Sequence, residues 1–342
     1  MKYFDKGLIA LTRFAVAIGE RLHGLLFGFM VRSGMVLCSS PMRSTDFKAI
    51  VEPILNQFFD GDYDTRKDEW KQVFDEIFPT IKRAYFEEPV GYGFGAAPEV
   101  AEGSPMTYQQ GGILFTKRYT YKQFGMAFAL TNIMYQDGDH INMGSTFSKH
   151  LAKAIVETQE TRCANVFNRA FNPSYVGGDG VALNSLVHPI ASGSFSNTLA
   201  TAAAMSQTSV EQMLIQIRKA VNNNGKRIKL LPQKIVCSSD NMFQAEVILK
   251  SPLRTGTNNN DINGIKSAGG LDESPAILSR IVSPTAWWIK TNAPEGLKVL
   301  VRQKMEKGME GDWETNSMRY KALIRMIEGW TDPRAAYGTA GI

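Results

Sequence analysis

The stretch from Asp137 to Asn172 constrains the fold of this chain more than any other. After an Asp-Gly-Asp turn it contains no proline, and its one glycine, Gly144, lies near the start. At ~1.5 Å per residue, a helix over this stretch would be about 40 Å long. Apolar side chains recur at spacings of three and four, which predicts one buried stripe: Phe147, Leu151, Ala154, Ile155 and Thr158, interrupted by Arg162 and resumed at Val166.

The other faces of this helix carry charged side chains, and we expect them to be exposed: Lys149, Lys153, Glu157, Glu160 and Arg169. Lys153 and Glu157 stand four residues apart, a spacing that allows an ion pair. The chain before the helix is extended or rich in loops, and the chain after it has the pattern of a mixed α+β domain. We therefore expect the helix to act as a strut between the two.

Bulk composition is that of an ordinary globular protein. The 342 residues are 44% hydrophobic and 21% charged, which allows one large domain or two to three smaller ones. The formal charge of +5 is a mild basic excess that slightly favours a polyanionic partner. Cys38, Cys163 and Cys237 are odd in number and widely spaced, so we interpret them as buried free thiols of a reducing compartment.

The N-terminal segment is apolar but does not match a membrane span. Residues 7–18 and 22–31 are separated and interrupted by charges, and neither reaches the ~18 uninterrupted apolar residues that a span needs. Asp5 and the absence of a clear cleavage site argue against a signal peptide. We interpret residues 1–45 as an N-terminal arm, poorly ordered or bound to a partner, or as an extension upstream of the true start. A membrane-associated protein that uses residues 1–34 is an alternative.

Residues 46–84 predict a helical region. Residues 46–59 predict a short helix broken at Pro53, and the acidic stretch from Asp60 to Asp64 predicts a turn. Residues 68–78 then place four apolar side chains on one face of an amphipathic helix: Trp70, Val73, Phe74 and Ile77.

Residues 85–127 predict a long two-stranded ribbon with a polar tip. They are rich in Tyr, Phe, Gly and Thr, and residues 111–127 have strand composition with a partial period of two. An isolated ribbon is at best marginally stable in water. A chain with such a ribbon is expected to bury it against another chain.

The C-terminal half alternates helices and strands. Residues 172–207 predict an irregular segment, and Thr208 with Glu211 predicts a capping box for a helix that ends at residues 222–225. Asp240 is expected to cap a second helix through Leu249, and a polar loop follows over residues 251–275. The remaining segments predict strands over residues 234–238, 276–281, 286–290, 297–305 and 318–327, and a closing turn over residues 329–338.

No motif predicts a catalytic, cofactor or metal site. The glycine-rich run from Gly91 to Ala96 matches a dinucleotide fingerprint in letters, but no helix is expected after it. Asn223–Arg227 resembles the end of a phosphate loop but follows a helix. Asp137, Asp139 and His140 are better explained as a helix start than as a cation site.

Residues Asp179–His188 could pair a serine with a histidine, yet no nucleophile elbow is present. His150 and Cys163 lie thirteen residues apart on one helix and do not converge. Solvated turns explain the acidic residues Glu87, Glu88, Asp60, Asp62 and Asp64. The basic residues are scattered and form no aromatic-interleaved cluster: Lys226, Arg227, Lys229, Lys304, Lys307, Arg319 and Lys321. A diffuse basic surface could still neutralise phosphates without reading sequence.

The order of these elements resembles the major capsid proteins of tailed bacteriophages, which have the Hong Kong 97-type fold. The stretch DTRKDEWKQVFDEIF leading into YFEEPVGYGFGAAPEVAEGSPMTYQQGG resembles the passage from arm to extended loop of a Mu-like or related prophage head subunit. The stretches DGVALNSLVHP with Asn197, PTAWWIKTNAPEGLKVLVR and RYKALIRMIEGWTDPRAAYG resemble later parts of such proteins. The resemblance covers residues 46–340.

The resemblance implies an α+β capsid fold with named parts. Residues 1–45 would be the N-terminal arm or extension, 46–84 a helical arm region and 85–127 the extended loop. Residues 128–206 and 286–342 would form a peripheral domain with a spine helix over 141–170, and residues 207–285 an axial domain.

The resemblance also implies a structural function without enzymatic activity or cofactors. Copies of the chain would form hexamers and pentamers of an icosahedral shell around double-stranded DNA, assembled in the bacterial host cytoplasm. Scaffold, portal and decoration proteins are further implied partners, and DNA contact would be non-specific. Some relatives crosslink a Lys to an Asn, but Lys117 and Lys122 have no identifiable partner asparagine. The alternative is a soluble α+β enzyme, a hydrolase or nucleotide-binding protein.

Overall fold

The computed structural model describes residues 44–64, 68–80, 83–131, 133–134, 140–254, 261–312, 314–315 and 317–341. Its contacts divide the chain into two units, Met1–Ala49 and Ile50–Ile342, and the description below concerns the second. Cys38 and most of the predicted N-terminal arm, together with Asp137 and Asp139, lie outside the described residues.

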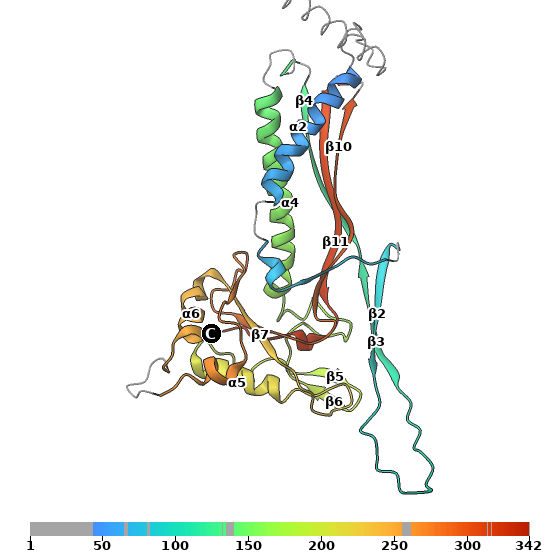
Figure 1. Cartoon of the computed structure of the whole chain (residues 1–342), viewed down its shortest axis with the longest axis vertical. Helices are drawn as coiled ribbons and strands as arrows, with labels where there is room; N and C mark the ends of the chain where they lie inside the picture. Colours follow the sequence, from blue (N-terminus) through green and yellow to red (C-terminus); the bar gives the residue numbers. More distant parts are fainter. Residues whose placement is uncertain are drawn as a thin grey trace, which may run out of the picture. The chain divides into compact units, whose positions relative to one another are not determined.

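The first sheet has four strands in the order β1-β10-β11-β4, and Figure 1 labels β4, β10 and β11. Its two long central strands, β10 (Leu297–Asp312) and β11 (Ser317–Trp330), pair antiparallel over almost their whole length. Strand β4 (Lys122–Thr131) continues the antiparallel pairing beyond β11, and β1 (Asp75–Ile77) runs parallel to β10. Strand β10 begins at the predicted residue 297 but continues past the predicted 305, and β11 extends beyond the predicted 318–327 at both ends, because the two strands pair with each other from Leu297 opposite Trp330 to Asp312 opposite Ser317.

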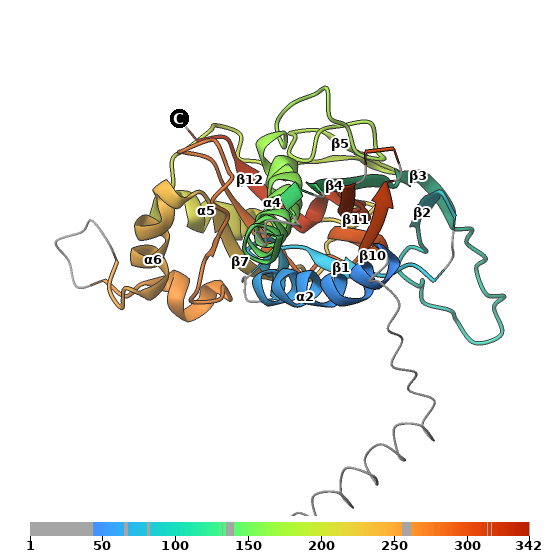
Figure 2. The same ribbon diagram turned by 90° about the horizontal axis from the view of Figure 1, so that it is seen from above.

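Two long helices lie against this sheet (Figure 2). Helix α4 (His140–Asn168) contacts β4 and β11, and helix α2 (Ser44–Asp64) is tied to both α4 and β11. The Ser148 hydroxyl of α4 donates to the Leu55 carbonyl of α2 at 2.8 Å, and the Tyr320 hydroxyl of β11 donates to Asn56 Oδ1 at 2.7 Å.

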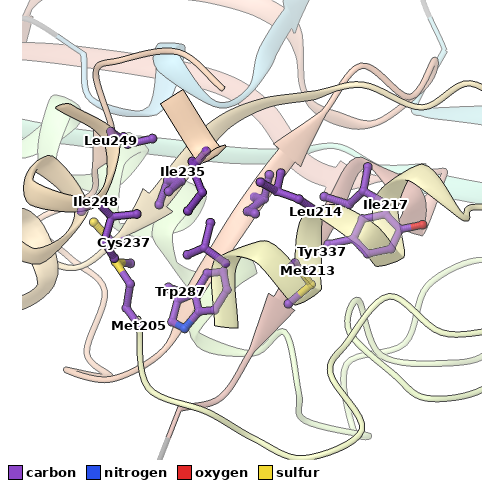
Figure 3. Packing of buried hydrophobic residues seen from close by; sticks show 14 of the residues in the cluster. Met205, Met213, Leu214, Ile217, Ile235, Cys237, Ile248, Leu249, Trp287 and Tyr337 are labelled. Carbon is purple, nitrogen blue, oxygen red and sulfur yellow. The ribbon is translucent and has the colours of Figure 1, made fainter. Parts of the chain in front are cut away.

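The second sheet has the strand order β12-β9-β7-β8. Strand β9 (Trp287–Thr291) pairs antiparallel with β7 (Pro232–Cys237) and β12 (Ala336–Thr339), whereas β8 (Ala276–Ile277) runs parallel to β7. Helices α5 (Gln207–Arg218) and α6 (Met242–Lys250) share one hydrophobic core with this sheet. In Figure 3 the side chains of Met205, Met213, Trp287 and Tyr337 lie in this core.

Smaller elements complete the structure. A two-stranded sheet pairs β2 (Tyr85–Tyr92) with β3 (Gly112–Thr120), and a second one pairs β5 (His188–Ile190) with β6 (Gly193–Phe195). Short helical turns span Trp70–Gln72, Ser239–Asn241, Ile265–Gly269 and Pro333–Ala335. The mixture of helices and sheets agrees with the predicted α+β class.

The long helix was predicted correctly, but the prediction of which of its residues are buried was only partly right. Leu151 and Ile155 are buried, whereas Ala154 and Thr158 are half-buried. Phe147 is 37% exposed and packs at the margin against the Phe128 ring. Contacts on more than one side bury a wider surface of the helix, which includes both apolar and polar residues: Ala152, Val156, Cys163 and Ala164, and Ser148, Gln159 and Glu160.

Two predictions for the region before the ribbon were wrong. Helix α2 does not break at Pro53 but continues through it to Asp64, so the predicted turn at residues 60–64 is helical. Residues 68–78 do not form an amphipathic helix: a 3-10 turn at Trp70–Gln72 is followed by strand β1. Trp70, Val73 and Phe74 are buried as their pattern predicts, while Ile77 is 39% exposed.

Several boundaries after the long helix also differ from the predictions. The cap of α5 is Ser206, whose hydroxyl accepts from the Ser209 amide, instead of Thr208 with Glu211. The helix ends at Arg218, before the predicted 222–225. Asn241 is the N-cap of α6 in place of Asp240, and the predicted closing turn contains strand β12.

Candidate assembly surfaces

The β2–β3 ribbon is the least self-buried part of the described structure. Its strands pair only with each other, from Tyr85 opposite Thr120 to Tyr92 opposite Gly112. Residues 93–111 between them contain no helix or strand, and Figure 1 shows them as a long open loop. Large apolar side chains on this loop and beside it are exposed: Phe94 by 68%, Met106 by 77%, Tyr108 by 97% and Ile113 by 67%. An exposed apolar surface of this kind indicates contact with another molecule.

The predicted ribbon was too long at its C-terminal end. Residues 122–131 leave it after Tyr121 and pair with β11 in the first sheet as β4. Residues 85–120 therefore form the ribbon, and β4 anchors it to the body of the protein.

A buried polar cluster fixes the root of the ribbon. Lys298 of β10 is only 2% exposed, and its ammonium group forms an ion pair with the Glu88 carboxylate of β2. The Thr331 hydroxyl donates to the same carboxylate, and it lies 2.6 Å from the Tyr119 hydroxyl. Burial raises the pKa of Tyr119, which keeps its phenol neutral. Separating β2 from β10 would leave a buried charge without its partner, which is costly, so this ion pair opposes movement of the ribbon root.

Contacts of Lys117 and close packing at Gly178 also hold the root of the ribbon in place. The Lys117 ammonium donates to the Val176 carbonyl at 3.1 Å and lies 5.5 Å from the Trp330 ring centroid. Burial lowers the pKa of Lys117. A Cβ atom at Gly178 would lie 2.7 Å from the Phe115 ring of β3, so only glycine allows this close approach.

The far end of the ribbon is held by a turn after α5. Asn224 Nδ2 donates to the Gly93 carbonyl at 2.6 Å, and Asn223 Nδ2 donates to the Gly91 carbonyl at 2.9 Å. Arg334 in turn donates to Asn223 Oδ1 at 2.9 Å and to the Val221 carbonyl at 2.7 Å. We call Asn223 and Asn224 the latch. The latch contacts only the start of the tip, so the exposed side chains remain uncovered.

Helix α4 is tied to its surroundings by buried charged groups that the sequence pattern did not identify. Glu160 is 4% exposed, contrary to the prediction that it faces solvent, and its carboxylate accepts from the amides of Glu69 at 2.7 Å and Trp70 at 3.2 Å. Burial raises the pKa of Glu160 to about 7, although the two amide donors favour the charged form. Arg162 forms an ion pair with Glu328 of β11.

Glu157 forms an ion pair with Arg280. Arg280 also lies 3.4 Å from Glu69, whose side chain accepts from the Ser279 amide at 2.8 Å. These contacts connect α4 to the segment before the ribbon and to the loop between β8 and β9 of the second sheet.

The serine–histidine arrangement within Asp179–His188 is a structural cluster. The His188 ring is fully buried, with Nδ1 2.7 Å from Asp179 Oδ2 and Nε2 3.0 Å from Asn197 Oδ1. The Ser185 hydroxyl accepts from the Val187 amide, and the Ser185 amide donates to Asn197. Because both imidazole nitrogens are occupied, His188 cannot act as a base for Ser185 in this arrangement.

The remaining candidates also do not assemble a chemical site. The glycine run at residues 91–96 ends β2 and enters the tip, and no helix follows to bind a phosphate. Cys163 and Cys237 are free and buried, and burial raises the pKa of both thiols. Of the C-terminal basic residues, Lys307 pairs with Asp60, Arg319 with Asp312 and Lys321 with Glu310.

The described residues contain neither a cluster of metal-binding side chains nor a helix suited to crossing a membrane. No group of three or more His, Cys, Asp and Glu side chains in those ranges could hold a metal ion. No helix within the same ranges is long and apolar enough to cross a membrane.

Comparison with known families identifies the class of protein to which the chain belongs. A family model described as phage capsid protein matches residues 115–339, more than half of the chain. The chain belongs to the phage capsid protein family. This capsid protein is a structural component of the virion that forms the shell of a phage head, which confirms the resemblance seen in its sequence.

Solved structures with a similar chain path include other capsid proteins. The virus-like particle of Pyrococcus furiosus aligns with a TM-score of 0.47 and 9% identity, covering 84% of this chain and 98% of that one. A phage-related protein from Bordetella bronchiseptica aligns with a TM-score of 0.47 and 12% identity, covering 84% and 95%. The cyanophage P-SCSP1u capsid gives a TM-score of 0.48 and 9% identity, covering 77% and 85%. No curated protein matches the sequence.

Proposed function

We propose that this capsid protein builds a Hong Kong 97-like icosahedral shell, in which each ribbon lies across a neighbouring copy. The observation that carries the proposal is the ribbon itself, anchored by a buried ion pair at its root but bearing exposed apolar side chains along its tip. Such side chains gain about 25 cal/mol per Å² only when another surface covers them. A contact between two different surfaces of identical copies closes into rings when the rotation fits.

In this proposal α4 is the spine, and the two sheets belong to different domains. The first sheet and the residues around α4 form the peripheral domain, predicted as 128–206 and 286–342. The α5–α6 region forms the axial domain, predicted as 207–285. We add β9 and β12 to the axial domain, because they share its sheet and its hydrophobic core.

The proposal includes rings of six and five copies that enclose double-stranded DNA and assemble in the host cytoplasm. Contact with DNA is non-specific, since the basic residues are dispersed and several are paired with acids. Scaffold, portal and decoration proteins complete the particle. The proposal assigns no enzymatic activity, and the filled hydrogen bonds of His188 support this.

Electron microscopy of the purified full-length protein tests the proposal. We expect rings or closed shells, formed alone or with a scaffold protein encoded beside it. A variant in which residues 96–107 are replaced by a short glycine-serine linker should fold but form neither. If the full-length protein stays monomeric under all assembly conditions, or if the shortened variant assembles normally, the proposed role of the ribbon is wrong.

A further inference from the structure

Strand β4 presents an open edge to solvent. It is the last strand of its sheet, and among the described strands it pairs only with β11. In an antiparallel pair, every second residue points its backbone N–H and C=O away from the partner. Most of β4 is exposed, and beyond Lys122 at its start the strand has none of the charged side chains and prolines that discourage pairing with another strand.

A groove runs beside this edge, between β4 and α4. It has a volume of about 230 Å³ and is lined by Gln123, Phe124, Gly125, Met126, Ala154, Ile155 and Thr158. Met126 is 56% exposed at its mouth, whereas Ile155 is buried at 2%. An open strand edge with a side-chain groove beside it is the arrangement by which proteins bind an added β-strand. Main-chain hydrogen bonds then give affinity and the groove gives specificity.

The ribbon tip of a second copy has a backbone that can pair with the open edge of β4 and side chains that can fill the groove. Residues 104–111 contain no helix or strand and are exposed, so their backbone is available for pairing. In an extended conformation Met106 and Tyr108 lie on one face, and they are 77% and 97% exposed. Phe124, Met126, Ala154 and Ile155 line the groove with apolar groups, and Gln123 and Thr158 offer polar groups to a tyrosine hydroxyl. The charged residues of the tip are Glu99 and Glu102, opposite in sign to Lys122 on β4.

We infer that residues 104–111 of one copy add to the open edge of β4 of a neighbouring copy and place Tyr108 in the groove between β4 and α4. This inference rests on the proposed function, because it names the surface on which the ribbon lies. It makes the sheet of each subunit continuous with a strand from the next one.

Site-specific photo-crosslinking in the assembled full-length protein tests the inference. Benzoylphenylalanine is placed at position 108, and isotope-labelled and unlabelled copies are mixed before assembly so that crosslinks between chains can be recognised. The control places the same group at Phe243 of α6, which is 74% exposed. We expect position 108 to crosslink between chains to peptides that contain residues 122–131 or 151–160, and position 243 not to do so.

A second variant fills the groove. Ala154→Trp places a bulky ring there, and the matched control Val247→Trp changes an exposed residue of α6. With folding checked by circular dichroism, Ala154→Trp should lower the crosslink yield from position 108 about tenfold, the effect of losing about 1.4 kcal/mol of contact. Val247→Trp should leave the yield unchanged.

The outcomes separate the two proposals. Crosslinks from position 108 to another surface, or only within one chain, in particles that assemble normally would overturn the docking on β4 and leave the proposed function standing. Unchanged crosslinking in Ala154→Trp would overturn the role of the groove. A protein that forms no particles would overturn the proposed function and this inference with it.

Discussion

At the scale of single residues, the buried carboxyl group of Glu160 makes stability depend on pH. Burial raises its pKa from 4.5 to about 7 in the folded protein. Its contribution to stability is therefore greatest below pH 4.5 and falls as the pH rises from 4.5 to about 7, because the unfolded chain ionises first. Glu160→Gln should reduce the difference in unfolding free energy between pH 5 and pH 8 by about 1–3 kcal/mol.

Urea denaturation at the two pH values measures this difference. The matched control is Glu102→Gln on the exposed ribbon tip, which should leave the pH dependence as it is in the unmodified protein. An unchanged pH dependence in Glu160→Gln would show that another group is responsible.

The ion pair between Lys298 and Glu88 should be costly to break from one side. Lys298→Met leaves the Glu88 carboxylate buried without its cation, which should destabilise the protein by about 3–5 kcal/mol. Adding Glu88→Gln should restore part of this loss, since an uncharged amide can still accept from Thr331. Lys290→Met is the control, because its partner Asp75 is 72% exposed and such pairs contribute about 1 kcal/mol or less. Equal losses from the two lysine variants would contradict the assigned role of the root.

The residue pattern could not reveal these groups. Glu160 occurs among charged residues of a helix and has the spacing of an exposed position. Its burial depends on two backbone amides at Glu69 and Trp70, about 90 residues away in the chain, which need an acceptor. Likewise, the sequence of Asp179–His188 offers at most a serine–histidine pair, and only the fold shows that Asp179 and Asn197 occupy the two ring nitrogens of His188.

At the scale of elements, local periodicity predicted the long helix correctly. It failed for segments whose conformation depends on contacts with residues far away in the chain. The long apolar repeat predicted α4 within a few residues of its ends. The repeat at residues 68–78 buries the expected Trp70 and Phe74, yet the segment forms a 3-10 turn and β1. Glu160 accepts from its first amides, and β10 pairs with its last residues. Pairing with β11 also divides the predicted ribbon at Tyr121.

Breaking α4 should prevent assembly. Ile155→Pro removes a buried side chain, an internal hydrogen bond and regular geometry at the middle of the helix, which together should cost about 3 kcal/mol or more. We expect no particles by electron microscopy. The control is Lys153→Ala, an exposed change on the same helix, which should assemble normally. Normal shells from Ile155→Pro would show that α4 is not a mechanical spine.

At the scale of the whole molecule, the sequence predicted the α+β class and the capsid family, because the order of helix, ribbon, long helix and late strands extends over most of the chain. The sequence did not show where the ribbon is held. The root joins Glu88 to Lys298, and the latch joins Gly93 to Asn224, pairs that are far apart in sequence and carry no motif. Both contacts can be identified only in the folded structure.

The central claim is that a neighbouring copy completes the ribbon. Hydrogen exchange of residues 93–111, measured by mass spectrometry in assembled particles and in the unassembled protein, tests it most directly. These residues have no helix or strand of their own, so we expect their amides to exchange fast in the free chain and at least tenfold more slowly in particles. Equally fast exchange in intact particles would contradict the claim, because a covered and paired tip must be protected.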